Sequence, residues 1–143
     1  MPYSATTTYR QQQAELSAIM ASLSELTSRQ DAMSHVLDIV AMLNRLSAKV
    51  TDVLTLEDKV LFPRLLNHPD ARVREAARRV QEEGGHLQPV FDDYFAIWSS
   101  PPAIVSRFPA FARETRMVLR RMQDRCRQEG EELFPLVDQA GLH

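Results

Sequence analysis

Apolar residues recur along this chain in alternating steps of three and four, the spacing that places side chains on one face of an α-helix. The longest such stripe consists of Val36, Ile39, Leu43, Leu46, Val50, Val53, Glu57 and Val60. Runs in which apolar and polar residues strictly alternate, which are typical of half-buried strands, are absent. The pattern therefore predicts an all-α fold.

The breaks between the stripes predict four helices, over about residues 9–28, 31–66, 70–99 and 103–138. Because the connections are short, neighbouring helices should run antiparallel, which gives an up-down-up-down four-helix bundle. We expect the bundle to occupy residues 9–138. Residues 1–8 and 139–143 should form an N-terminal and a C-terminal tail.

Local chemistry supports these breaks. Asp31 and Asp70 are candidates for N-caps, and Pro101 follows the third helix and opens the fourth. Within the third helix, the Gly84-Gly85 pair costs roughly 2 kcal/mol relative to two alanines. We therefore expect this helix to kink or restart around His86.

Composition narrows the class of protein. The 143 residues are typical of one domain, and 17 Lys and Arg against 19 Asp and Glu give a net charge of -2. This balance argues against nucleic acid as the partner. The one cysteine, Cys126, excludes an internal disulfide and is predicted to be a buried free thiol, with a redox-sensing thiol as the alternative. No run resembles a membrane span or a secretory signal, so we expect a cytoplasmic protein.

Three charged residues interrupt the apolar stripes. Glu57 falls in step on the stripe of the second predicted helix, given above. Arg125 and Glu129 fall in step on the stripe of the fourth predicted helix, which consists of Phe108, Phe111, Thr115, Val118, Met122, Arg125 and Glu129. A buried carboxylate costs several kcal/mol unless it is paired or binds a metal. Their occurrence near corresponding ends of two helices predicts one polar centre inside the bundle.

A repeat supports this interpretation. The sequence Glu-x-x-x-x-Phe-Pro begins at Glu57 and begins again at Glu129, 72 residues later. Each copy closes a helical hairpin of similar length. The chain therefore looks like two helix pairs related by an approximate twofold axis, with both glutamates facing the same interior.

These motifs resemble the hemerythrin-like (HHE cation-binding) family, and the resemblance covers nearly the whole chain. In that family, His-x-x-x-Glu precedes Leu-Phe-Pro on the second and fourth helices, and the first and third helices each carry one more histidine. Together these residues hold an oxo-bridged pair of iron ions. The resemblance implies that Glu57, Glu129 and His86 occupy ligand positions in this chain.

The other family histidines are replaced. Val53 and Arg125 stand four residues before the two glutamates, and the position on the first helix falls near Gln12. A guanidinium repels cations and offers a planar fork of donors that suits carboxylates. We therefore hypothesise that Arg125 takes the place of the diiron centre, with Glu57, Glu129 and a protonated His86 completing a neutral polar core.

This hypothesis predicts a binding, regulatory or structural module without a cofactor. The alternative is an iron protein that senses oxygen or nitric oxide, or handles iron, through a mononuclear or dinuclear site at Glu57, His86 and Glu129. A redox catalyst at that site is a third possibility, although no motif of a known enzyme class is present.

The remaining features point to surfaces. His35, His68 and His143 are expected at the surface or in loops. The arginines of the fourth helix are expected on a solvated face, with phosphate or RNA contact as the alternative. The first helix is rich in Gln, Ser and Thr, which leaves open an unknown protein partner or self-association.

Overall fold

The computed structural model describes residues 4–142, and no strand occurs among them. The all-α prediction is confirmed. In chain order the elements are α1 (Thr7–Ser28), η1 (Ala32–His35), α2 (Val36–Leu56), η2 (Glu57–Leu61), α3 (Phe62–Leu66), α4 (Ala71–Gly84), α5 (Leu87–Ile97), α6 (Pro101–Ser106), α7 (Phe108–Gln128), η3 (Glu129–Leu133) and α8 (Phe134–Ala140). Here η1 is a 3₁₀ turn, whereas η2 and η3 are π-helical turns.

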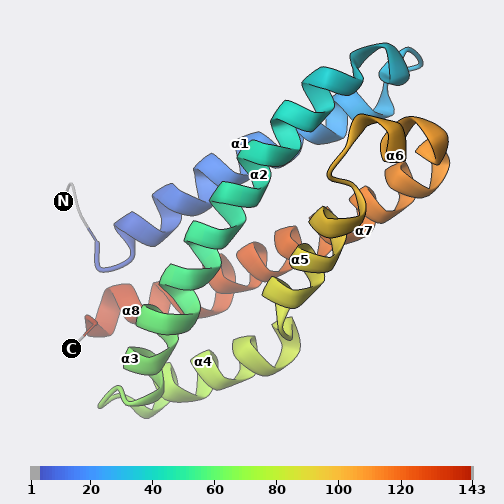
Figure 1. Ribbon diagram of the computed structural model, residues 1–143. Helices are drawn as coiled ribbons and strands as arrows, with labels where there is room; N and C mark the ends of the chain where they lie inside the picture. Colours follow the sequence, from blue (N-terminus) through green and yellow to red (C-terminus); the bar gives the residue numbers. More distant parts are fainter. Residues whose placement is uncertain (1–3, 143) are drawn as a thin grey trace.

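The elements assemble into a helical bundle. Figure 1 shows α2 returning beside α1, and α7 with α8 running back to the end at which the chain starts. The helix pair α4 and α5 covers the face between α2 and α7. No helix in the described part of the chain is long and apolar enough to cross a membrane.

The expected breaks lie at the glycine and proline signals. Asp70 caps α4 by accepting a hydrogen bond of 2.9 Å from the backbone N–H of Arg72. The third helix ends at Gly84 and restarts at Leu87, as predicted, and Gly85 has a φ of 67° that favours glycine. The fourth helix has one break that the sequence analysis missed, at Arg107.

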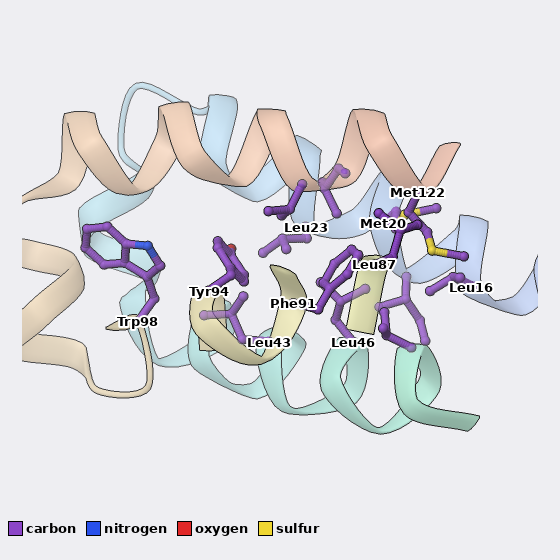
Figure 2. Close-up of a cluster of buried hydrophobic side chains, with 14 of the residues drawn as sticks. Leu16, Met20, Leu23, Leu43, Leu46, Leu87, Phe91, Tyr94, Trp98 and Met122 are labelled. Atoms are coloured by element: carbon purple, nitrogen blue, oxygen red, sulfur yellow. The ribbon is translucent and has the colours of Figure 1, made fainter. Parts of the chain in front are cut away.

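The interior contains two hydrophobic clusters. The larger one joins α1, α2, α5 and α7, and Figure 2 shows its side chains from Leu16 and Met122 at one end to Trp98 at the other. Trp98 is buried, and its indole N–H donates to Glu114 at 2.5 Å. The smaller cluster joins Tyr9 of α1 to α3, α4, η3 and α8.

Two π-helical turns lie in the two copies of the Glu-x-x-x-x-Phe-Pro motif. The backbone N–H of Phe62 bonds the carbonyl of Glu57, five residues back, and Phe134 bonds Glu129 in the same way. Each following proline has no N–H to give to the helix, which favours a local change of the hydrogen-bonding pattern. The same sequence motif therefore produces the same backbone irregularity twice.

The first π-helical turn corrects one position of the predicted stripe. Such a turn contains one extra residue, so the side chain that faces the core shifts along the sequence by one. Leu61 is buried, whereas Val60, which the three-four spacing places on the stripe, is 43% exposed. The three-four spacing therefore identifies the buried face of the helix up to Glu57, and beyond Glu57 it is wrong by one residue.

The two ends of the chain are joined by a polar contact. Thr6 is fully buried, and both its backbone N–H and its hydroxyl donate to the carboxylate of Asp138, at 3.0 and 2.7 Å. Arg10 forms an ion pair with the same carboxylate. The helix α1 begins at Thr7 and α8 ends at Ala140, so Thr6 belongs to the folded body and not to the expected tail.

His68 lies in the loop between α3 and α4, as expected, and its side chain is buried there. Its Nδ1 accepts a hydrogen bond of 2.9 Å from the backbone N–H of Asp70, and its Nε2 lies 2.7 Å from the carbonyl oxygen of Gly141. His68 therefore fastens the C-terminal residues to this loop, a tertiary contact that local sequence does not reveal.

Candidate functional site: a buried polar layer

Four buried polar side chains lie between the two hydrophobic clusters, and we call them the polar layer: Gln13, Glu57, Arg125 and Glu129. Along the chain, each of these polar residues has apolar residues of the larger cluster on one side and apolar residues of the smaller cluster on the other. On α1, for example, Gln13 lies between Tyr9 and Leu16. The polar layer therefore divides the bundle core into two parts.

Arg125 connects three carboxyl groups. Its Nη2 donates to Oε1 of Glu57 at 3.0 Å and to Oδ1 of Asp58 at 2.8 Å. Its Nε lies 3.7 Å from Oε2 of Glu129, close enough for an ion pair but not for a hydrogen bond. The Arg125 side chain is 5% exposed, so solvent screens these attractions weakly.

Gln13 completes the layer from α1. Its side-chain NH₂ donates to Oε2 of Glu57 at 3.0 Å and to Oε1 of Glu129 at 2.7 Å. An amide NH₂ has two donors, so one side chain can hold both carboxyl groups. The family resemblance predicted the relevant position near Gln12. The run of three glutamines gave the right helix, but only the packing shows which of them faces the interior.

The electrostatics of the polar layer favour the protonated form of Glu129. Complete burial, the neighbouring charge of Glu57 and the hydrogen-bonding contact with Glu57 raise the pKa of Glu129 well above its ordinary value, although Arg125 and Gln13 oppose the shift. The opposite charges raise the pKa of Arg125 despite the opposing effect of its burial. The guanidinium of Arg125 stays paired with the carboxylates of Glu57 and Asp58.

The shifted pKa of Glu129 predicts how stability depends on pH. A carboxyl group whose pKa is raised by folding stabilises the native state fully below its unfolded pKa of about 4.3, and this stabilisation is lost as pH rises towards the folded pKa. The free energy of unfolding should therefore fall above about pH 4.3, by up to about 1.4 kcal/mol per pH unit for one proton. Denaturant unfolding at several pH values measures the slope.

The control for this prediction is Glu129→Gln, which keeps a neutral side chain of the same shape at every pH. In the wild type, stability should fall between the pKa of Glu129 in the unfolded state and its raised pKa in the folded state. This fall should disappear in the variant. Asp31 and Asp70, each with a pKa lowered to about 2 by hydrogen bonds from arginine, affect stability only below about pH 4. An equal slope in both proteins would show that Glu129 is not the titrating group.

The surroundings of Arg125 fit a long planar cation. The guanidinium carbon lies 5.5 Å from the centre of the Phe62 ring, a cation–π contact. On the other side, a Cβ at Gly84 would lie 3.6 Å from Cδ of Arg125, which is ordinary van der Waals contact. The aliphatic part of the Arg125 side chain therefore packs against the end of α4 at Gly84.

The structure does not bring His86 into the polar layer. His86 is the N-cap of α5, its side chain is exposed, and it forms no hydrogen bond or ion pair with Glu57, Arg125 or Glu129. The backbone explains this position, because α4 ends at Gly84 and the chain turns away before α5 begins. His86 therefore lies outside the polar layer and does not contribute to its charge balance.

The other candidates lie away from the layer or at its edge. Cys126 is half-buried, and burial together with the charges of Glu129 and Glu57 raises the pKa of its thiol. A protonated thiol reacts slowly, which disfavours the redox-sensing alternative. His35 is partly exposed beside Asp31 and Asp38. His143 lies outside the described residues.

Comparisons with known proteins assign the chain to a family. The family model of the hemerythrin HHE cation-binding domain matches residues 4–137, so the match includes every element from α1 to η3 and most of α8. No curated protein and no solved structure matches the chain. The family model covers all four residues of the polar layer.

Proposed function

The chain belongs to the hemerythrin HHE cation-binding domain family, and from this premise we propose that it is a metal-independent member. In this proposal the bundle acts as a binding, regulatory or structural module, and its polar layer organises the fold. The observation that carries the proposal is the buried hydrogen bond of 3.0 Å from Arg125 to Glu57. It places a fixed positive charge among the carboxyl groups that the family resemblance assigns to metal binding.

The donor set does not fit a pair of iron ions. Iron in such sites is held by imidazole and carboxylate ligands. Among the described residues, no group of three or more His, Cys, Asp or Glu side chains is placed to hold a metal ion. Glu57 and Glu129 share the donors of Gln13, and Arg125 lies beside both. The exposed position of His86 also removes the imidazole of the alternative site.

Electrostatics favour the same conclusion. A divalent cation between Glu57 and Glu129 would meet the guanidinium of Arg125, whose raised pKa keeps it charged. At a distance of about 4 Å and an effective dielectric constant of about 20, each unit of like charge costs about 4 kcal/mol. The ion would also have to displace the proton of Glu129. The two buried atoms of the layer without a hydrogen bond, Nε of Arg125 and Oε2 of Glu129, face each other as an ion pair at 3.7 Å, so the guanidinium stands beside the free carboxyl oxygen that a metal ion would need.

The polar layer can select one arrangement of the helices. A hydrophobic core alone tolerates sliding and rotation of helices, whereas a buried polar network is satisfied in one register. Here α1, η2, α7 and η3 each contribute one member of the network. We infer that the layer fixes the relative positions of these elements and so fixes the surfaces that the module presents to its partners.

The test is metal content together with stability. Protein purified without chelators should contain no stoichiometric metal, and neither EDTA nor added Fe²⁺ should change its thermal unfolding midpoint. A specifically bound ion at a hundredfold excess over its Kd would add about 2.7 kcal/mol of stability, which is easily measured. Elemental analysis and thermal unfolding make the comparison.

The opposite outcome is equally clear. About two irons per chain, with an absorption band from an oxo-bridged pair, would overturn the proposal. A single stoichiometric iron whose removal lowers the unfolding midpoint would overturn it too. A folded, metal-free protein whose midpoint ignores chelator and iron supports it.

A further inference from the structure

A second feature lies on the outer surface, where α1 and α7 pack side by side. A groove of about 430 Å³ opens between these two helices. We call it the basic groove, and it is lined by Ser24, Arg113, Arg116, Met117, Leu119, Arg120 and Gln123. No acidic and no aromatic side chain is among its lining residues.

The arginines of the basic groove have no counter-charge within the described residues. Arg113, Arg116 and Arg120 are exposed, and none of them forms an ion pair or a side-chain hydrogen bond there. The nearby acids are engaged elsewhere. Asp124 pairs with Arg127 at 3.1 Å, and Glu114 accepts the hydrogen bond of Trp98.

This arrangement opposes the stability of α7. The three arginines are spaced by three and four residues, so they lie on one face of the helix as neighbours. Like charges at this spacing repel each other and destabilise a helix. The fold therefore gains nothing from the cluster, in a protein whose net charge is -2. A bound anion would relieve the repulsion.

We propose that the basic groove binds a small ligand that carries several phosphate groups. Each guanidinium offers a planar fork of donors that matches phosphate oxygens. Ser24 and Gln123 add neutral donors from both helices, and Met117, 61% exposed, offers an apolar wall. The volume lies within the range of small-molecule sites. Single-stranded nucleic acid fits less well, because the groove has no aromatic residue on which bases could stack.

The basic groove is separate from the polar layer, so this inference goes beyond the proposed metal-independent role. If phosphate binding is not found, the proposal for the polar layer is unaffected. Isothermal titration calorimetry with tripolyphosphate at low ionic strength tests it directly. The variant pair is Arg116→Gln with Arg120→Gln. The control pair is Arg78→Gln with Arg79→Gln, which removes the same charge from exposed positions on α4.

Tripolyphosphate should bind the wild-type protein, and the groove pair should bind about tenfold more weakly or not at all, as expected when charged hydrogen bonds are lost. The control pair should stay within about twofold of wild type. A second arm uses vesicles containing a phosphoinositide. Dependence on Arg116 and Arg120 in either arm supports the phosphate site, and the arm that binds identifies its source as soluble or lipid. No binding in either arm, or equal losses in both pairs, overturns the proposal.

Discussion

Replacing Arg125 by alanine should lower the free energy of unfolding by about 3–5 kcal/mol at neutral pH, the range seen when one partner of a buried ion pair is removed. The substitution leaves the carboxylate of Glu57 buried without a cationic partner, and it opens a space beside Phe62 and Gly84. Denaturant unfolding followed by circular dichroism measures the change.

The neighbouring Arg121 provides the matched control, because its side chain is exposed on the same helix. Arg121→Ala should change stability by no more than about 0.5 kcal/mol. The double variant Glu57→Gln with Arg125→Met should be more stable than Arg125→Ala, since it removes both charges together. A loss below about 1 kcal/mol for Arg125→Ala would show that the ion pair contributes little and would remove the basis of the proposed role.

The polar layer could be predicted from the sequence wherever helical periodicity was unbroken. Six apolar positions in step precede Glu57, and a similar run precedes Arg125 and Glu129. Such runs define which face of a helix is buried, so a charged residue on that face is visible as an exception. Gln13 was harder to identify, because three consecutive glutamines do not show which of them lies on the buried face of the helix. The spacing of the apolar residues around them locates that face only to within one residue.

His86 could not be placed in the same way, because periodicity ends where the backbone pattern changes. The positive φ of Gly85 starts a new helix with its own phase, so counting from α4 does not predict the direction of the next side chain. The prediction that Val60 faces the core is wrong for a related reason, because the π-helical turn η2 contains an extra residue. The resemblance to a family identified the sequence position of His86 but not the direction of its side chain. In this chain that direction decides whether the histidine reaches the interior.

The two π-helical turns connect the repeat in the sequence with the chemistry of the layer. Each begins at a buried glutamate and ends before a phenylalanine whose ring contacts a guanidinium, Phe62 with Arg125 and Phe134 with Arg10. The two cations do not stand at equivalent positions of the repeat, since Arg125 corresponds to Val53 and Arg10 to Glu82. They also differ in burial, because Arg10 pairs with the partly exposed Asp138 whereas Arg125 is enclosed.

The strongest test of the role of Arg125 is to restore a metal-ligating donor set. The triple variant Gln13→His, Val53→His and Arg125→His removes the guanidinium and supplies three imidazoles. Two of them stand four residues before Glu57 and Glu129, on the same helix face. We expect this variant to bind Co²⁺ stoichiometrically, since imidazole and carboxylate ligands suit such ions. Titration of the Co²⁺ absorption spectrum measures binding.

The double variant Gln13→His with Val53→His keeps Arg125 and isolates the effect of its charge. Both variants offer new imidazoles, but only the triple variant lacks the fixed cation, so only it should gain about 2.7 kcal/mol of stability at a hundredfold excess of Co²⁺ over its Kd. Equal affinity in the two variants would show that the guanidinium moves aside for a metal ion. In that case Arg125 would be a replaceable neighbour of a latent metal site, and the charge argument for a metal-independent protein would fail.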